Sequence, residues 1–161
     1  MKLSSLIRPA AGLAMAGLFA VSAVAADLEV ANPWVRGTVA AQKATGAFMK
    51  LSSKSGVTLV GVASPAANVV EIHEMVMADN VMKMRAMPRL EVKPGQPLEL
   101  KPGSYHVMLI DLKKPLAKGE IVPITLKVEG KDNKVESVEV KAEVRDLTAA
   151  APAPMDHKHH H

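Results

Sequence analysis

Residues that interrupt regular structure recur at short intervals through most of this chain. Between about residue 28 and residue 145, runs rich in Val, Leu, Ile and Thr are separated by Gly, Pro, Asn or Asp, as at Ser55-Gly56, Asp79-Asn80 and Pro94-Gly95. Short β-branched runs with regular turn signals are typical of a β-sandwich or a β-barrel. The sequence therefore predicts a single all-β domain without a long amphipathic helix.

The runs between these turn signals are the expected strands. They cover residues 28–36, 45–52, 57–62, 68–77, 81–86, 97–101, 104–112, 120–129 and 134–145. In the last of them, every second residue from Val138 to Val144 is apolar and the residues between are polar. This alternation indicates a strand with one face in water.

The two ends of the chain have different compositions from the middle. A basic start, an apolar run of about a dozen residues and the motif Ala23-Val24-Ala25 are typical of a secretory signal peptide. We expect residues 1–26 to be removed by cleavage before Ala26 or Asp27, which predicts an exported protein. No later run reaches the roughly 18 apolar residues of a spanning helix, so we expect no membrane span in the mature protein.

The remaining chain divides into an expected β-domain at 27–146 and a tail at 147–161. Without Lys2 and Arg8 it carries 18 basic and 16 acidic residues, and it has a single Trp and a single Tyr. That composition lacks the basic patch and stacking aromatics of a nucleic-acid-binding protein. There is no cysteine, which excludes thiol catalysis and a blue-copper centre, because both need a thiolate.

Both histidines of the expected domain share one spacing pattern with two methionines. His73, Met84, His106 and Met108 form the sequence H-x10-M-x21-H-x-M. Two imidazoles and two thioethers are a soft, uncharged ligand set, and soft sulfur ligands select Cu(I), whereas oxygen ligands suit Mg, Ca and Mn. The four residues are therefore a candidate Cu(I) site.

Strand geometry indicates how two of these ligands come together. His106 and Met108 are two residues apart in the expected strand 104–112, and side chains two apart share a face. They should therefore converge on one point.

A hairpin is expected around Asp79-Asn80, because Asx residues tolerate the left-handed conformations of tight turns. A two-residue turn would place Met77 opposite Met82 and Met75 opposite Met84. His73 and Met84 would then be diagonal neighbours on one face, within reach of long side chains.

Each of these residues also has a simpler explanation. A single His in a strand is more often a surface or core residue than a ligand, and Met often fills gaps in cores. Five of the ten methionines fall between residues 75 and 87. For Met75, Met77, Met82 and Met87, a flexible contact surface is the competing interpretation.

The tail contains a second candidate metal site. Its Ala/Pro-rich linker ends in residues whose side chains commonly bind metals, namely Met155, His157, His159, His160 and His161. Short His-rich tracts are typical of metal binding. An affinity-tag remnant is the alternative, and the signal peptide at the other end of the chain favours a natural tail.

The pattern and its flanking segments resemble the periplasmic copper chaperones called PCu(A)C. The resemblance covers roughly Leu28 to Val144 and rests on H-x10-M-x21-H-x-M and on the segments Ala31–Arg36, Leu59–Ala66, Glu71–Met75 and Leu100–Leu109. The segment 46–49 also fits, although the family often has Tyr in place of Phe48 and an Asn where this chain has Ser52-Ser53. These differences lie outside the candidate ligands.

The resemblance implies a cupredoxin-like or Ig-like Greek-key β-sandwich that binds Cu(I) and delivers it to the binuclear copper centre of cytochrome c oxidase. The expected partner is the copper-binding subunit of that oxidase or another periplasmic copper chaperone, and the protein is expected to be a monomer. Similar tails are associated with Cu(II). Two alternatives stay open, a copper scavenging or resistance protein and a metal-free β-sandwich adaptor. The sequence has no nucleophile–base signature, so we do not expect an enzyme.

Overall fold

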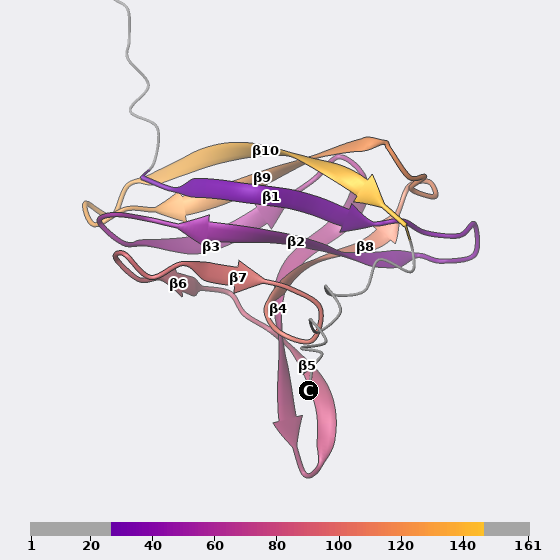
Figure 1. The fold of residues 1–161 in the computed structure, drawn as a ribbon, viewed down its shortest axis with the longest axis horizontal. Coiled ribbons are helices and arrows are strands. Elements are labelled where there is room, and N and C mark those ends of the chain that lie inside the picture. The colour runs from indigo at the N-terminus through magenta and orange to yellow at the C-terminus, as the bar shows by residue number, and fades with distance from the viewer. Residues whose placement is uncertain (1–26, 147–161) are drawn as a thin grey trace, which may run out of the picture.

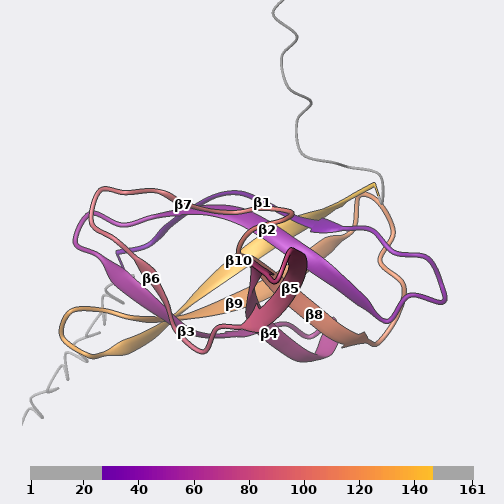
Figure 2. The same ribbon diagram turned by 90° about the horizontal axis from the view of Figure 1, so that it is seen from below.

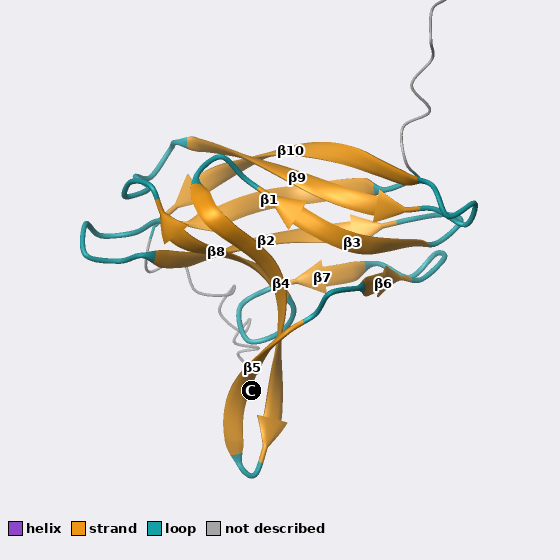
Figure 3. Ribbon diagram, turned by 180° about the vertical axis from the view of Figure 1, so that it is seen from behind, coloured by secondary structure: helices purple, strands orange, loops and turns teal. Residues whose placement is uncertain are grey.

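The computed structural model describes residues 27–146, and every regular element within that range is a β-strand (Figure 3). The ten strands are β1 (Glu29–Arg36), β2 (Ala44–Ser52), β3 (Val57–Ala63), β4 (Ala67–Ala78), β5 (Val81–Ala86), β6 (Leu90–Val92), β7 (Leu98–Leu100), β8 (His106–Leu112), β9 (Ile121–Glu129) and β10 (Val135–Arg145). The expected signal peptide and the His-rich tail lie outside the described residues. Within 27–146, no helix has the length and apolarity needed to cross a membrane.

The all-β prediction is confirmed, and each expected strand is present within a few residues of its expected bounds. One strand was not expected. β6 is three residues long and follows directly after Pro88 and Arg89. Leu90 and Val92 are buried and Glu91 is exposed, but an alternation over three residues is too short to identify a strand in the sequence.

The strands follow a continuous hydrogen-bonded path in the order β5-β4-β8-β2-β1-β10-β9-β3-β6, with β7 paired to β2 beside that path. β1 and β10 run parallel, and the other paired strands run antiparallel. Because the path curls, strands from its two arms enclose the same interior (Figure 1).

One core holds the two arms together as a sandwich. Ala47, Ile72 and Val107 come from the arm of β2, β4 and β8, and Leu59 and Leu126 come from the opposite arm. All five side chains are at most 3% exposed. Burial of apolar surface of this kind is the dominant stabilising contribution to a fold without disulfides.

The β4–β5 hairpin projects from this sandwich. It extends away from the body in Figures 1 and 3, and in Figure 2 it lies over the middle of the body. Its turn residues Asp79 and Asn80 have φ angles of 54° and 59°, as a type I′ turn requires. Every residue of β5 is exposed. The strand is therefore held mainly by its pairing with β4 and little by side-chain packing.

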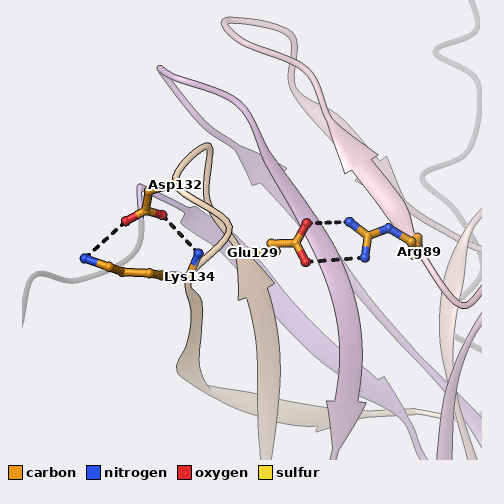
Figure 4. A network of polar contacts seen from close by, with 4 residues as sticks. All are labelled: Arg89, Glu129, Asp132 and Lys134. Atoms are coloured by element: carbon orange, nitrogen blue, oxygen red, sulfur yellow. Dashed lines mark hydrogen bonds and ion pairs between the residues drawn. The ribbon is translucent and has the colours of Figure 1, made fainter.

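Ion pairs support two connections at the edge of the sandwich (Figure 4). Arg89 follows the hairpin and donates two hydrogen bonds to Glu129 at the end of β9, which lowers the pKa of that carboxyl. Asp132 accepts a hydrogen bond from the backbone N–H of Lys134 at the β9–β10 turn. The first contact ties the exit of the hairpin to the body.

Candidate metal centre

The four spaced residues lie on the outer face of β4, β5 and β8. His73 pairs directly with His106 across β4 and β8, and Met108 shares the face of His106 two residues along. Met84 pairs with Met75 on the other side of β4, two pairs beyond the His73–Ala86 pair and therefore on the same face. The expected hairpin register and the shared face are therefore confirmed.

A pocket of about 240 Å³ opens on this face. Met84, His106 and Met108 line it, together with Met75. His106 is 6% exposed and Met84 is 48% exposed, so the pocket runs from a buried end to an open rim. His73 lies beside the pocket, with its ring centroid 5.9 Å from that of His106.

His106 offers one free ring nitrogen to the pocket. Its Nδ1 lies 3.0 Å from the carbonyl oxygen of Ser104. A carbonyl only accepts, so Nδ1–H is the donor and Nε2 keeps its lone pair. Burial lowers the pKa of His106, and the nearby His73 and Arg36 lower it further, against the Ser104 hydrogen bond that raises it. The ring therefore stays neutral at pH values where an exposed His begins to protonate.

In His73 the free ring nitrogen is Nδ1, whereas in His106 it is Nε2. The Nε2–H of His73 donates to Glu71 Oε2 over 2.7 Å, because an ionised carboxylate can only accept. The Nδ1 atom is buried and has no hydrogen-bond partner among residues 27–146. A buried donor without an acceptor is costly, so the arrangement favours a ring that presents Nδ1 as a bare lone pair.

Glu71 was missed by the sequence reasoning. It lies opposite Met108 in the β4–β8 ladder, and it shares a face with His73 because the two are two residues apart. Metal-binding histidines commonly donate their other ring N–H to a carboxylate or a backbone carbonyl. Glu71 and Ser104 supply those acceptors here. Glu74, by contrast, is adjacent to His73 in β4, so it lies on the other face, where it pairs with Arg85.

Phe48 of β2 forms part of one wall of the pocket, and Trp34 of β1 packs against Phe48. Phe48 lines the pocket, with its ring centroid 6.3 Å from that of His106 and 4.5 Å from that of Trp34. Gly46 pairs with Met108, and a Cβ at Gly46 would lie 2.7 Å from Phe48 Cζ. The glycine therefore lets the Phe48 ring fold back over β2 beside the methionine.

The charges around the pocket disfavour a hard divalent cation. Arg36 lines the pocket and its Cζ lies 5.6 Å from the centre of the Phe48 ring. No carboxylate is among the pocket-lining residues in the described part of the chain. With a guanidinium nearby and neutral N and S donors, the site has little to stabilise a hard divalent ion, whereas Cu(I) matches soft ligands.

Solved structures share this fold. The PCuAC domain of PmoF2 without copper superposes with a TM-score of 0.62 at 22% identity, over 77% of this chain and 94% of that domain. DR1885 of Deinococcus radiodurans in its Cu(I) form superposes with a TM-score of 0.54 at 33% identity, over 78% of this chain and 85% of that protein. The all-β sandwich prediction is thus confirmed by the fold of PCuAC domains.

Sequence comparison extends the likeness to the whole domain. The chain is 29% identical to "Putative lipoprotein Lxx21020" of Leifsonia xyli subsp. xyli over 115 residues, which cover 71% of this chain and 69% of that protein. The family described as "Putative lipoprotein LpqE-like" matches residues 28–144. That range runs from the residue before β1 almost to the end of β10, so the chain belongs to the LpqE-like family.

Proposed function

We propose that this protein is a periplasmic copper chaperone that carries one Cu(I) at His73, Met84, His106 and Met108. The observation that carries the proposal is the buried Nδ1 of His73, which has no hydrogen-bond partner among residues 27–146. It lies on the same face as one further imidazole and two thioethers. Copper binding by this chain is supported by the Cu(I) form of DR1885, a protein that is 33% identical to it.

The proposed binding atoms follow from the hydrogen bonds of the two rings. His73 would bind through Nδ1, since its Nε2–H is held by Glu71, and His106 would bind through Nε2, since its Nδ1–H is held by Ser104. The thioethers of Met84 and Met108 need no deprotonation and bind at any pH. The ligand set is neutral throughout, so anionic thiolates of an acceptor can displace it one ligand at a time. From these features we infer a carrier.

Replacing Glu71 with alanine tests the binding atom of His73. We expect Cu(I) to bind about 10- to 100-fold more weakly, as is typical when the hydrogen-bond partner of a metal-binding His is removed. Glu71→Gln keeps an acceptor oxygen and should lose less. The measurement is a competition titration with a Cu(I) chelator. Glu74→Ala on the opposite face is the matched control.

Long-range ¹H–¹⁵N NMR of the copper-free protein gives a second readout for the same idea. His73 should show the Nε2–H tautomer and His106 the Nδ1–H tautomer, and Glu71→Ala should disturb the first alone. Tighter Cu(I) binding in Glu71→Ala would instead mean that Glu71 competes with copper for His73, and unchanged binding would mean that this hydrogen bond does not support the site.

We further propose that the acceptor is the binuclear copper centre of cytochrome c oxidase. Mixing the Cu(I)-loaded protein with the metal-free copper domain of the oxidase subunit should move copper to the acceptor, because thiolates bind Cu(I) more strongly than thioethers do. Copper that stays on the chaperone in the presence of a competent acceptor would favour scavenging or storage. A protein that takes up no copper would favour the adaptor alternative.

A second proposal concerns the tail, whose candidate ligands Met155, His157, His159, His160 and His161 lie outside the described residues. We propose that it binds Cu(II). Truncation after Asp146 should remove a Cu(II) signal in electron paramagnetic resonance and leave Cu(I) affinity intact. The same Cu(II) spectrum before and after truncation would count against a tail site.

A further inference from the structure

Methionines continue beyond the candidate site toward the tip of the β4–β5 hairpin. Met75 pairs with Met84, and Met77 pairs with Met82 in the next position outward on the same face. Both pairs share that face with His73, because residues 73, 75 and 77 alternate with residues whose side chains point the other way. We call Met75, Met77, Met82 and Met84 the thioether ladder.

The register brings these side chains close together. Ala78 and Val81 flank the two-residue turn, where a type I′ hairpin has a hydrogen-bonded pair. The pair type alternates along an antiparallel ladder, so both methionine pairs occupy non-hydrogen-bonded positions, at which Cα atoms lie about 4.5 Å apart and side chains are closest. Flexible thioether side chains at such positions can direct several sulfur atoms to one ion.

Packing does not account for the outer part of the ladder. Met77 is 65% exposed and Met82 is 46% exposed, so neither fills a core. Met87, at the base of the hairpin, is the counterexample, because it packs against the core cluster. Exposing these paired methionine side chains to water is unfavourable. Their presence on the hairpin is therefore not explained by a contribution to the stability of the fold.

The other face of the hairpin has a different chemistry. Arg85 pairs with Glu74 there, and Lys83 pairs with Asp79 near the turn. The hairpin therefore has one charged face and one sulfur face. Within β4 and β5, all the methionines lie on the face that also carries the candidate Cu(I) ligands, and the projection of the hairpin from the body puts them where a partner can reach them (Figure 1).

We propose that Met77 and Met82, assisted by Met75, form a second, thioether-only Cu(I) site through which the ion enters and leaves the inner site. This inference rests on the proposed function of the inner site. The outer site has no imidazole and is open to water, so it binds more weakly and exchanges faster. Met75 lies between the two positions, because it pairs with Met84 and also lines the inner pocket.

The test uses full-length protein with ¹³C-labelled methionine methyl groups, titrated with Cu(I) under a reductant. The first equivalent should shift the methyl signals of Met84 and Met108. The second should shift those of Met77 and Met82, whereas Met87 should stay in place. Met155 in the tail has its own signal, so binding there is seen separately.

The double variant Met77→Leu with Met82→Leu keeps the apolar bulk and removes the sulfur. We expect it to retain the first equivalent with unchanged affinity, lose the hairpin equivalent, and release Cu(I) more slowly to a thiolate-bearing acceptor. Met87→Leu is the matched control and should behave as the wild type. Static Met77 and Met82 signals with several equivalents added, or an unchanged release rate in the double variant, would overturn this inference and leave the inner site standing. Static Met84 and Met108 signals would instead overturn the proposed function.

Discussion

Replacing His106 and Met108 together with alanine is expected to abolish Cu(I) binding to the folded domain. The variant removes an imidazole and a thioether, which sit two residues apart on β8 and are half of the proposed ligand set. The loss should exceed the roughly 100-fold that removal of a supporting hydrogen bond costs a metal site. A competition titration against a Cu(I) chelator measures it.

The control for this variant is Ile110→Ala. Ile110 is the next residue on the same face of β8, opposite Val69 in the β4–β8 ladder, and it does not line the pocket among the described residues. It should leave Cu(I) affinity unchanged. If the His106 and Met108 double variant kept wild-type affinity in a folded protein, the inner site would have to be elsewhere.

Replacing Leu109 with alanine is expected to lower the stability of the fold and to leave Cu(I) affinity unchanged. Leu109 lies on the inner face of β8 and is 0% exposed. Truncation of a buried Leu leaves a cavity and lowers the free energy of unfolding by about 2–5 kcal/mol. The folded fraction should still bind Cu(I) with wild-type affinity, because no proposed ligand is touched.

Urea unfolding of the copper-free protein measures the Leu109 effect, and Ile110→Ala again serves as the neighbouring control with a smaller change. Residues on the inner face of β8 would then determine stability, and His106 and Met108 on its outer face would determine metal binding. A loss of Cu(I) affinity in folded Leu109→Ala would contradict this division and would indicate that core packing sets the position of the ligands.

The local part of the site was readable from the sequence. Asp79-Asn80 predicts a two-residue turn, and that turn fixes the register which brings Met84 diagonal to His73. The two-residue spacing of His106 and Met108 fixes their common face. Such inferences succeed because turn chemistry and strand alternation depend only on neighbours in the chain.

The parts that the sequence did not reveal depend on contacts between distant strands. The choice between sandwich and barrel depends on pairings such as that of β1 with β10, which join opposite ends of the domain. The packing of Trp34 against the pocket residue Phe48 depends on the β1–β2 pairing and on an irregularity between Ala31 and Trp34. Neither pairing leaves a signal in a short sequence window.

Alternation itself failed at one residue. Strict alternation would place Leu112 on the face of His106, but Leu112 is buried in the core with Val107 and Leu109. Asp111 has a φ of 57°, and a residue in this left-handed region interrupts the regular alternation of the strand. Glu71 is a different case, because the two-residue spacing places it on the face of His73, but spacing alone does not show that its carboxylate accepts the Nε2–H of His73.

The position of β5 at one end of the strand order has a consequence for solubility. Its outer backbone edge has no neighbouring strand within the described part of the chain, and an open edge invites strand addition by a second molecule. Lys83 and Arg85 project from this strand, and charged side chains on an edge oppose such pairing. The hairpin can therefore leave its methionines open to an arriving ion while its own edge resists aggregation.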